Sequence, residues 1–332
     1  LADRVDRRVM VAGAEVAQGV ASLVLAWNAS RTAPSLAVIV VASIVAAGAY
    51  ALERPSLDAL VPRLVDPHEL PAAAALTSVQ YAVGSLVGPV GAGLLIAGAG
   101  LPWAYALDAA TFVVSAGALL AIRATPPPPE GAAVSLRGIA EGLAFARARP
   151  VLLGTYASDI VVMLFGMPEA VLPQLADGLG GARSLGVLVA APAVGSLALT
   201  LTSGWTAAVR RRGAAVVLAG AAYGLAIAVA GLVDGLWPVA ALLAVAGGAD
   251  QVSGLFRQRI WNETIPDHLR GRLAGIEMLS WSSGPLLGRV ESGAAEALVG
   301  LRGSLVGGGL LATAAGAACA AALPAYWRDR AG

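Results

Sequence analysis

Apolar runs of about 20 residues recur along the whole of this chain, and short polar or proline-containing links separate them. A hydrocarbon core about 30 Å thick is crossed by roughly 20 residues of a helix that rises 1.5 Å per residue. Charged residues make up only 13% of the chain, against roughly 25% in soluble domains. The pattern predicts an all-α integral membrane protein.

Ten apolar runs are long enough to be spans, four before residue 123 and six after residue 150. They cover residues 9–27, 35–52, 72–99, 103–122, 151–172, 184–203, 213–233, 236–255, 273–295 and 303–323. Four consecutive prolines and an arginine-bearing amphipathic stretch separate the two groups, as in a linker. We therefore predict an N-terminal helical bundle at 1–122, a central loop at 123–150 and a six-helix bundle at 151–332.

A long internal period relates the two groups of spans. When the sequence is shifted by 200 positions, Gly84 falls on Gly284 and Gly88 falls on Gly288. A fixed period of this kind indicates two related halves. Since the first half has four spans and the second has six, we expect two further helices before Leu1 and twelve in the full-length protein.

The basic residues, all of them arginines, predict the orientation in the membrane. With alternate loops assigned to alternate sides, 18 of the 22 fall on one side, three on the other and one within a span. The side rich in basic residues is the cytoplasmic one. We predict a multi-pass protein of the cell inner membrane whose central loop and C-terminus are cytoplasmic.

A glycine and proline motif lies in the third apolar run. Spacing of the G-x-x-x-G type places small residues on one helix face, where backbones can approach closely, and an internal proline can bend the helix. We predict a helix-packing role for this motif, whose residues are Gly84, Gly88, Pro89 and Gly93.

These features together resemble the major facilitator superfamily, whose twelve helices form two six-helix bundles joined by a long cytoplasmic loop. The opening LADRVDRR is similar to that family's loop signature G-x-L-A-D-R-x-G-R-R, with Asp6 in place of its glycine. The glycine motif is similar to the family's antiporter-associated G-x-x-x-G-P-x-x-G-G, with Ala92 in place of its penultimate glycine. Residues 105–120, 159–176 and 246–288 resemble the enterobactin-exporter-type branch, which exports siderophores and drugs.

The charged opening segment predicts a cytoplasmic gate. A carboxylate and guanidiniums on the cytoplasmic rim can form charge-assisted hydrogen bonds in one state of a transporter and release them in the other. Charge that only sets topology would explain the arginines but not the acid. The gate residues are Asp3, Arg4, Arg7 and Arg8.

Ionisable side chains within the apolar runs are the candidates for a substrate or proton pathway, because each costs about 2.5–3.5 kcal/mol to insert. Asp159 and Asp250, with the adjacent Gln251, could share a proton or a cationic group. The alternative is that each acid caps a helix turn or pairs with an arginine such as Arg257. Glu15 and Asp108 are expected to make structural hydrogen bonds.

A polar and aromatic patch within the ninth run includes Trp281 and Ser282. It could bind an aromatic substrate such as a catecholate, although packing against neighbouring helices would also explain it.

The remaining motifs limit the function. The sequence has no lysine and no Walker-type phosphate loop, which argues against ATP hydrolysis by this chain. Its single cysteine, Cys319, and two histidines predict no disulfide, metal site or cofactor. We predict a monomeric secondary transporter, not an enzyme or nucleic-acid binder, that exports a small siderophore-like or drug-like molecule by alternating access in exchange for protons. The alternatives are a membrane subunit of an ATP-driven permease or an inactive transporter fragment.

Overall fold

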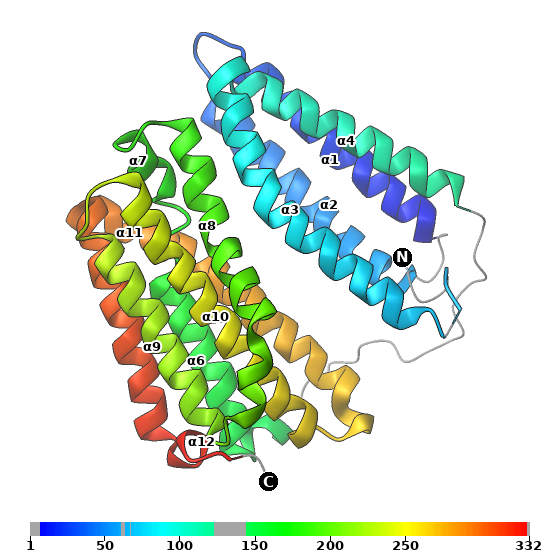
Figure 1. Cartoon of the computed structure of the whole chain (residues 1–332). Helices are drawn as coiled ribbons and strands as arrows, with labels where there is room; N and C mark the ends of the chain where they lie inside the picture. The colour runs from blue at the N-terminus through cyan, green and yellow to red at the C-terminus, as the bar shows by residue number, and fades with distance from the viewer. Residues whose placement is uncertain (1–6, 61–63, 67, 123–143, 331–332) are drawn as a thin grey trace. The chain divides into compact units, whose positions relative to one another are not determined.

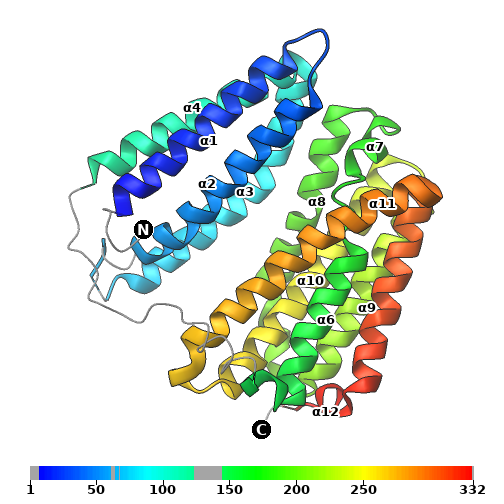
Figure 2. The ribbon, with the colours of Figure 1, turned by 180° about the vertical axis from the view of Figure 1, so that it is seen from behind.

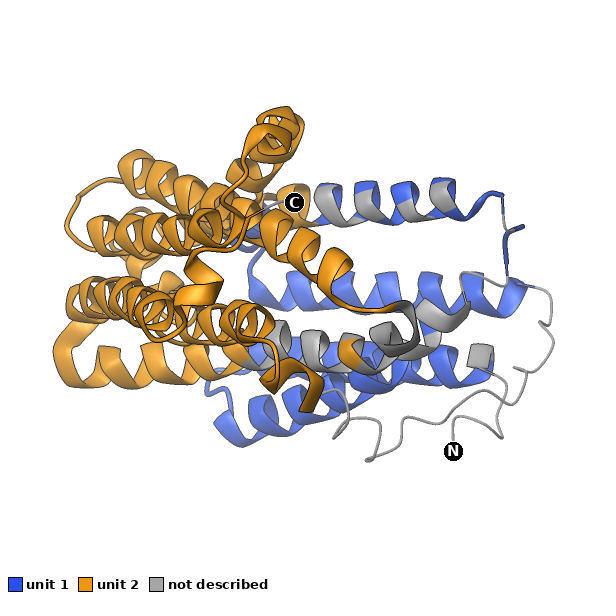
Figure 3. Ribbon diagram, turned by 90° about the horizontal axis from the view of Figure 1, so that it is seen from below, with its two compact units in different colours: residues 1–84, 91–131 blue, residues 85–90, 132–332 orange. Residues whose placement is uncertain are grey.

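A computed structural model describes residues 7–60, 64–66, 68–122 and 144–330 of the chain, and every regular element within these ranges is a helix (Figure 1). The predicted all-α class is confirmed. The chain divides into two compact units, Leu1–Gly84 with Gly91–Gly131 and Ser85–Val90 with Ala132–Gly332 (Figure 3). The domain limits at residues 122 and 150 stay predictions, because most of the linker lies outside the described residues.

The first unit consists of four helices, apart from Ser85–Val90 of the third, which fall in the second unit. The four helices are α1 (Arg7–Ala29), α2 (Leu36–Leu60), α3 (Leu70–Ala99) and α4 (Leu101–Ala121). α1 packs against both α2 and α4. Gly100, at φ 92°, joins α3 to α4 in a conformation that favours glycine. Along α1 the buried residues recur every three or four positions, as expected of one helix face turned toward neighbouring helices.

The second unit contains the other helices (Figures 1 and 2). They are α6 (Pro150–Gly166), α7 (Leu172–Asp177), α8 (Ala182–Leu201), a 3-10 turn (Ser203–Ala208), α9 (Arg212–Ala230), α10 (Leu236–Thr264), α11 (Asp267–Ala322) and α12 (Pro324–Trp327). α6 and α9 both pack against α11, and α8 and α9 both pack against α10. Gly300, at φ 76°, divides the long α11 into two successive helices.

Seven helices of the described chain are long and apolar enough to cross a membrane, and two shorter apolar helices are Val83–Ala99 and Pro150–Gly166. The ten predicted spans all fall on helices, two of them on the halves of α11. Because α3 and α6 supply only the shorter apolar segments, the count of ten stays a prediction.

Several helix limits differ from the expected span limits, and prolines explain two of the helix ends. α6 ends at Gly166 rather than 172 because Met167, which precedes Pro168, is extended at φ −87° and ψ 102°. α10 continues past 255 to Thr264, and Ile265 before Pro266 is extended at φ −93° and ψ 115°. The residue before a proline is sterically kept out of the helical region.

Glycines allow close helix contacts in the second unit. An added Cβ at Gly288 of α11 would overlap the Met163 carbonyl oxygen of α6 and lie 2.8 Å from the Met167 Cβ. In the second copy of the glycine motif, Gly288 therefore allows close packing of α11 against α6. At Gly84 and Gly88 an added Cβ would meet no atom within 4 Å, and the packing role of that first copy stays a prediction.

Candidate functional site

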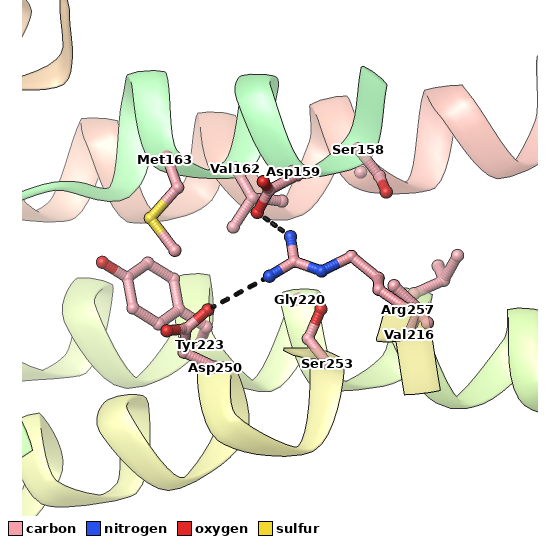
Figure 4. Close-up of a pocket in the computed structure, with 12 residues that line it drawn as sticks. Ser158, Asp159, Val162, Met163, Val216, Gly220, Tyr223, Asp250, Ser253 and Arg257 are labelled. Carbon is pink, nitrogen blue, oxygen red and sulfur yellow. Dashed lines mark ion pairs between the residues drawn. The ribbon is translucent and has the colours of Figure 1, made fainter. Parts of the chain in front are cut away.

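A small cavity within the second unit is surrounded by α6, α9, α10 and α11 (Figure 4). Its volume of about 20 Å³ is room for about one water molecule. Asp159 of α6 and Asp250 of α10, the two acids singled out in the sequence, both line it. The structure thus brings together two side chains that are 91 residues apart in the chain.

Arg257 of α10 lies between the two carboxylates (Figure 4). Its Nη1 forms an ion pair with Oδ1 of Asp159, and its Nη2 lies 4.0 Å from Oδ1 of Asp250. Asp250 and Arg257 are seven residues apart, which is two turns of one helix, so they project from the same face. We refer to these three side chains as the ion cluster.

The three members of the ion cluster differ in their exposure. The Asp159 side chain is 2% exposed and that of Arg257 is 11% exposed, whereas the Asp250 side chain is 43% exposed. The Nε of Arg257 is buried and has no hydrogen-bond partner among the described residues. With both carboxylates ionised the cluster has a net charge of −1, since one guanidinium faces two acids.

The polar face of α6 is formed by Thr155, Ser158 and Asp159, which are at positions i, i+3 and i+4 and so lie on one side of the helix. Thr155 accepts a hydrogen bond of 2.9 Å from an indole N–H, and Ser158 lies 2.9 Å from a tyrosine hydroxyl. The indole belongs to Trp261 of α10 and the tyrosine is Tyr326 of α12. Asp159 pairs with Arg257 of α10. One face of α6 therefore meets both α10 and the C-terminal segment.

The third predicted residue, Gln251, is directed elsewhere. Its Oε1 accepts a hydrogen bond of 2.8 Å from the Ser196 hydroxyl of α8, and it is not among the residues that line the cavity. A role in the substrate or proton pathway for Gln251 stays a prediction.

The other predicted sites are outside what the structure describes. Asp3 and Arg4 lie before the first described residue, and the side chains of Arg7 and Arg8 are not described. The side chains of Trp281 and Ser282 are not described either. The cytoplasmic gate and the aromatic patch therefore stay predictions.

Two side chains at this site gain importance from the structure. The sequence indicates Arg257 only as a structural partner of an acid, although its spacing of seven residues from Asp250 places both on one helix face. Tyr326 gave no signal, because a single tyrosine after the last apolar run is typical of a membrane boundary.

The acids of the first unit make the hydrogen bonds expected of them. The Ser115 hydroxyl of α4 donates to Oε1 of Glu15 in α1 at 2.6 Å. In the reciprocal arrangement, the Ser22 hydroxyl of α1 donates to Oδ2 of Asp108 in α4 at 2.6 Å.

Apolar helices around an ion cluster are typical of polytopic membrane proteins of the transporter class, since ionisable groups within apolar helices mark substrate or ion pathways. The profile of the Major Facilitator Superfamily matches residues 1–288. The chain belongs to this superfamily, a family of secondary transporters and not of enzymes. This membership favours a secondary transporter over a subunit of an ATP-driven permease.

Relatives and a solved structure agree with this assignment. The chain is 30% identical over 301 residues to the enterobactin exporter EntS of Shigella boydii serotype 18 (strain CDC 3083-94 / BS512), covering 90% of this chain and 72% of that protein. It is 29% identical, with the same coverage, to the enterobactin exporter EntS of Escherichia coli O81 (strain ED1a). The fold is similar to the crystal structure of a POT family transporter in complex with a thioalcohol-conjugated peptide, at TM-score 0.71 and 11% identity over 98% of this chain and 83% of that one.

Proposed function

We propose that this chain exports a small siderophore-like or drug-like molecule by alternating access, in exchange for protons, and that the ion cluster carries the proton. The observation that supports this most is one buried guanidinium placed between two carboxylates of different exposure. The relatives named as enterobactin exporters support a siderophore as the first substrate to test.

Within the ion cluster we assign the exchangeable proton to Asp250. Asp159 is almost fully buried and directly paired with Arg257, so its charge is compensated. Asp250 is 43% exposed and 4.0 Å from the shared guanidinium. Uptake of a proton by Asp250 removes the net charge of −1 and leaves Arg257 to Asp159 alone. Loss of the proton restores the competition of two carboxylates for one guanidinium.

The surroundings of the cluster are also part of the proposal. We propose that the protein acts as a monomer in the cytoplasmic membrane, with its central loop and C-terminus cytoplasmic, as the distribution of arginines favours. The opening segment with Asp3 and Arg4 is proposed as a cytoplasmic gate. The first glycine motif, around Gly88 and Pro89, is proposed to pack helices together.

Asp250→Asn is expected to abolish the dependence of export on a pH gradient, because the amide cannot take up and release the proton. The measurement is export of enterobactin, and separately of ethidium, by proteoliposomes with and without an imposed pH gradient. Asp159→Asn is expected to abolish gradient-driven export as well, since it leaves Arg257 without its main partner.

Asp234→Asn is the matched control. Asp234 has an 84% exposed side chain that pairs with Arg302 outside the ion cluster, so gradient-driven export should be unchanged. Export by Asp250→Asn that still follows the pH gradient would show that Asp250 does not carry the proton. Transport of neither probe by the wild-type chain would overturn the proposed substrate class.

A further inference from the structure

The short segment after the last long helix lies mostly exposed on the second unit, but one of its side chains is buried in that unit. Tyr326 of α12 is 0% exposed. Its ring lies against Gly154 of α6, where an added Cβ would overlap the ring, and its carbonyl oxygen lies against Gly213 of α9 in the same way. Two glycines thus leave the space that this one tyrosine occupies.

An arginine at the start of α9 anchors the same segment. Arg212 is 6% exposed. Its Nε donates to Oδ2 of Asp329 at 3.0 Å, its Nη2 donates to the carbonyl oxygen of Arg330 at 3.1 Å, and its Nη1 pairs with Glu263 at the end of α10. Hydrogen bonds to charged groups are worth more than neutral ones, so the segment is fixed to α9 and, through Arg212, to the end of α10.

The hydroxyl of Tyr326 extends from this anchored segment to the polar face of α6. It lies 2.9 Å from the Ser158 hydroxyl, and Ser158 lines the cavity beside Asp159. Burial raises the pKa of Tyr326 to about 12, although the hydrogen bond with Ser158 and the charge of Arg257 oppose that increase. The phenol therefore stays protonated at physiological pH and remains a neutral hydrogen-bond partner.

We propose that the C-terminal segment 324–330 is part of the transport site and that Tyr326 is a positioning residue. Through Ser158 it holds the polar face of α6 at the rotation where Asp159 meets Arg257. The bond between the two hydroxyls ties α6 to the anchored segment, while Ser158 also bonds to the Thr155 carbonyl oxygen of its own helix at 3.2 Å. Loss of either hydroxyl removes this tie, and α6 can then turn away from the rotation that sets the ion pair. The effect on transport rests on the proposed function, whereas the effect on the ion pair does not.

Tyr326→Phe tests the positioning directly, because it keeps the ring against Gly154 and removes only the hydroxyl. The measurement is modification of the Asp159 carboxyl by dicyclohexylcarbodiimide in the purified full chain, quantified by peptide mass spectrometry. This reagent modifies protonated carboxyl groups in apolar surroundings. We expect several-fold greater modification of Asp159 in Tyr326→Phe than in the wild type, since a carboxylate that loses its guanidinium takes up a proton.

Ser158→Ala provides the second arm. If Tyr326 and Ser158 act only through the bond between their hydroxyls, Ser158→Ala should raise modification of Asp159 to the same level as Tyr326→Phe. The double variant, Ser158→Ala with Tyr326→Phe, should reach that level and no more. Tyr50→Phe, at a tyrosine of α2 that is 55% exposed, should leave it unchanged. Asp159→Asn should remove the signal and so identify the modified residue.

Unchanged modification in a Tyr326→Phe protein with wild-type thermal stability would overturn the positioning role, and so would additive effects of the two single variants. Enterobactin export is measured on the same proteins, with the expectation that Tyr326→Phe shifts the pH profile of export. The two proposals can fail separately. If modification of Asp159 rises in Tyr326→Phe while Asp250→Asn still exports in response to the pH gradient, Asp250 is not the proton carrier, but the positioning of Asp159 by Tyr326 stands.

Discussion

Arg257→Gln is expected to destabilise the second unit by about 3–5 kcal/mol and to reduce pH-driven export to background. The reason is the cost of removing the guanidinium that pairs with a buried carboxylate, since Asp159 is 2% exposed and paired with Arg257. Stability is measured by thermal unfolding in detergent with a thiol-reactive dye, which Cys319, the only cysteine of the chain, makes possible. Export is measured with enterobactin in proteoliposomes.

A charge-neutral double variant separates the loss of folding from the loss of function. Arg257→Gln with Asp159→Asn removes both charges, so most of the stability should return, because replacing both partners is far less costly than removing one. Export should stay at background. Recovery of export together with stability would contradict any role of the ion cluster in transport.

Gly288→Leu is expected to prevent assembly of the second unit, and Gly288→Ala to destabilise it by about 1–3 kcal/mol, a typical cost of overpacking. At this position α11 approaches α6 so closely that an added Cβ would overlap the Met163 carbonyl oxygen. A backbone atom cannot move aside as a flexible side chain can, so the two helices must separate. The measurement is the same thiol-reactive unfolding assay together with the yield of monodisperse protein.

Gly293→Ala is the matched control on the same helix. An added Cβ at Gly293 meets no atom within 4 Å, and alanine is more favourable than glycine within a helix by about 0.5–1 kcal/mol. We expect unchanged or slightly higher stability for this variant. Equal destabilisation by Gly288→Ala and Gly293→Ala would show that helix content rather than the contact with α6 determines the outcome.

The sequence predicted the fold class because apolar runs of membrane length leave few other folds. It also indicated Asp159 and Asp250 as candidates, since a charge within an apolar run is costly and therefore conspicuous, and both line one cavity; their role in transport stays a prediction. It did not predict that Gln251 bonds to Ser196 on α8, because the direction of a side chain depends on how the helix is rotated about its axis. Tyr326 could not be found either, since its importance comes from space left by Gly154 and Gly213 on other helices.

The acids of the first unit have a mechanical consequence. Glu15 and Ser22 are seven residues apart on α1, and Asp108 and Ser115 are seven apart on α4, so the two serine–carboxylate bonds lie about 10.5 Å apart along antiparallel helices. Sliding one helix by a single turn, about 5.4 Å, would break both bonds at once. We expect α1 and α4 to move as one rigid body during transport, so any bending of the first unit has to occur outside this pair.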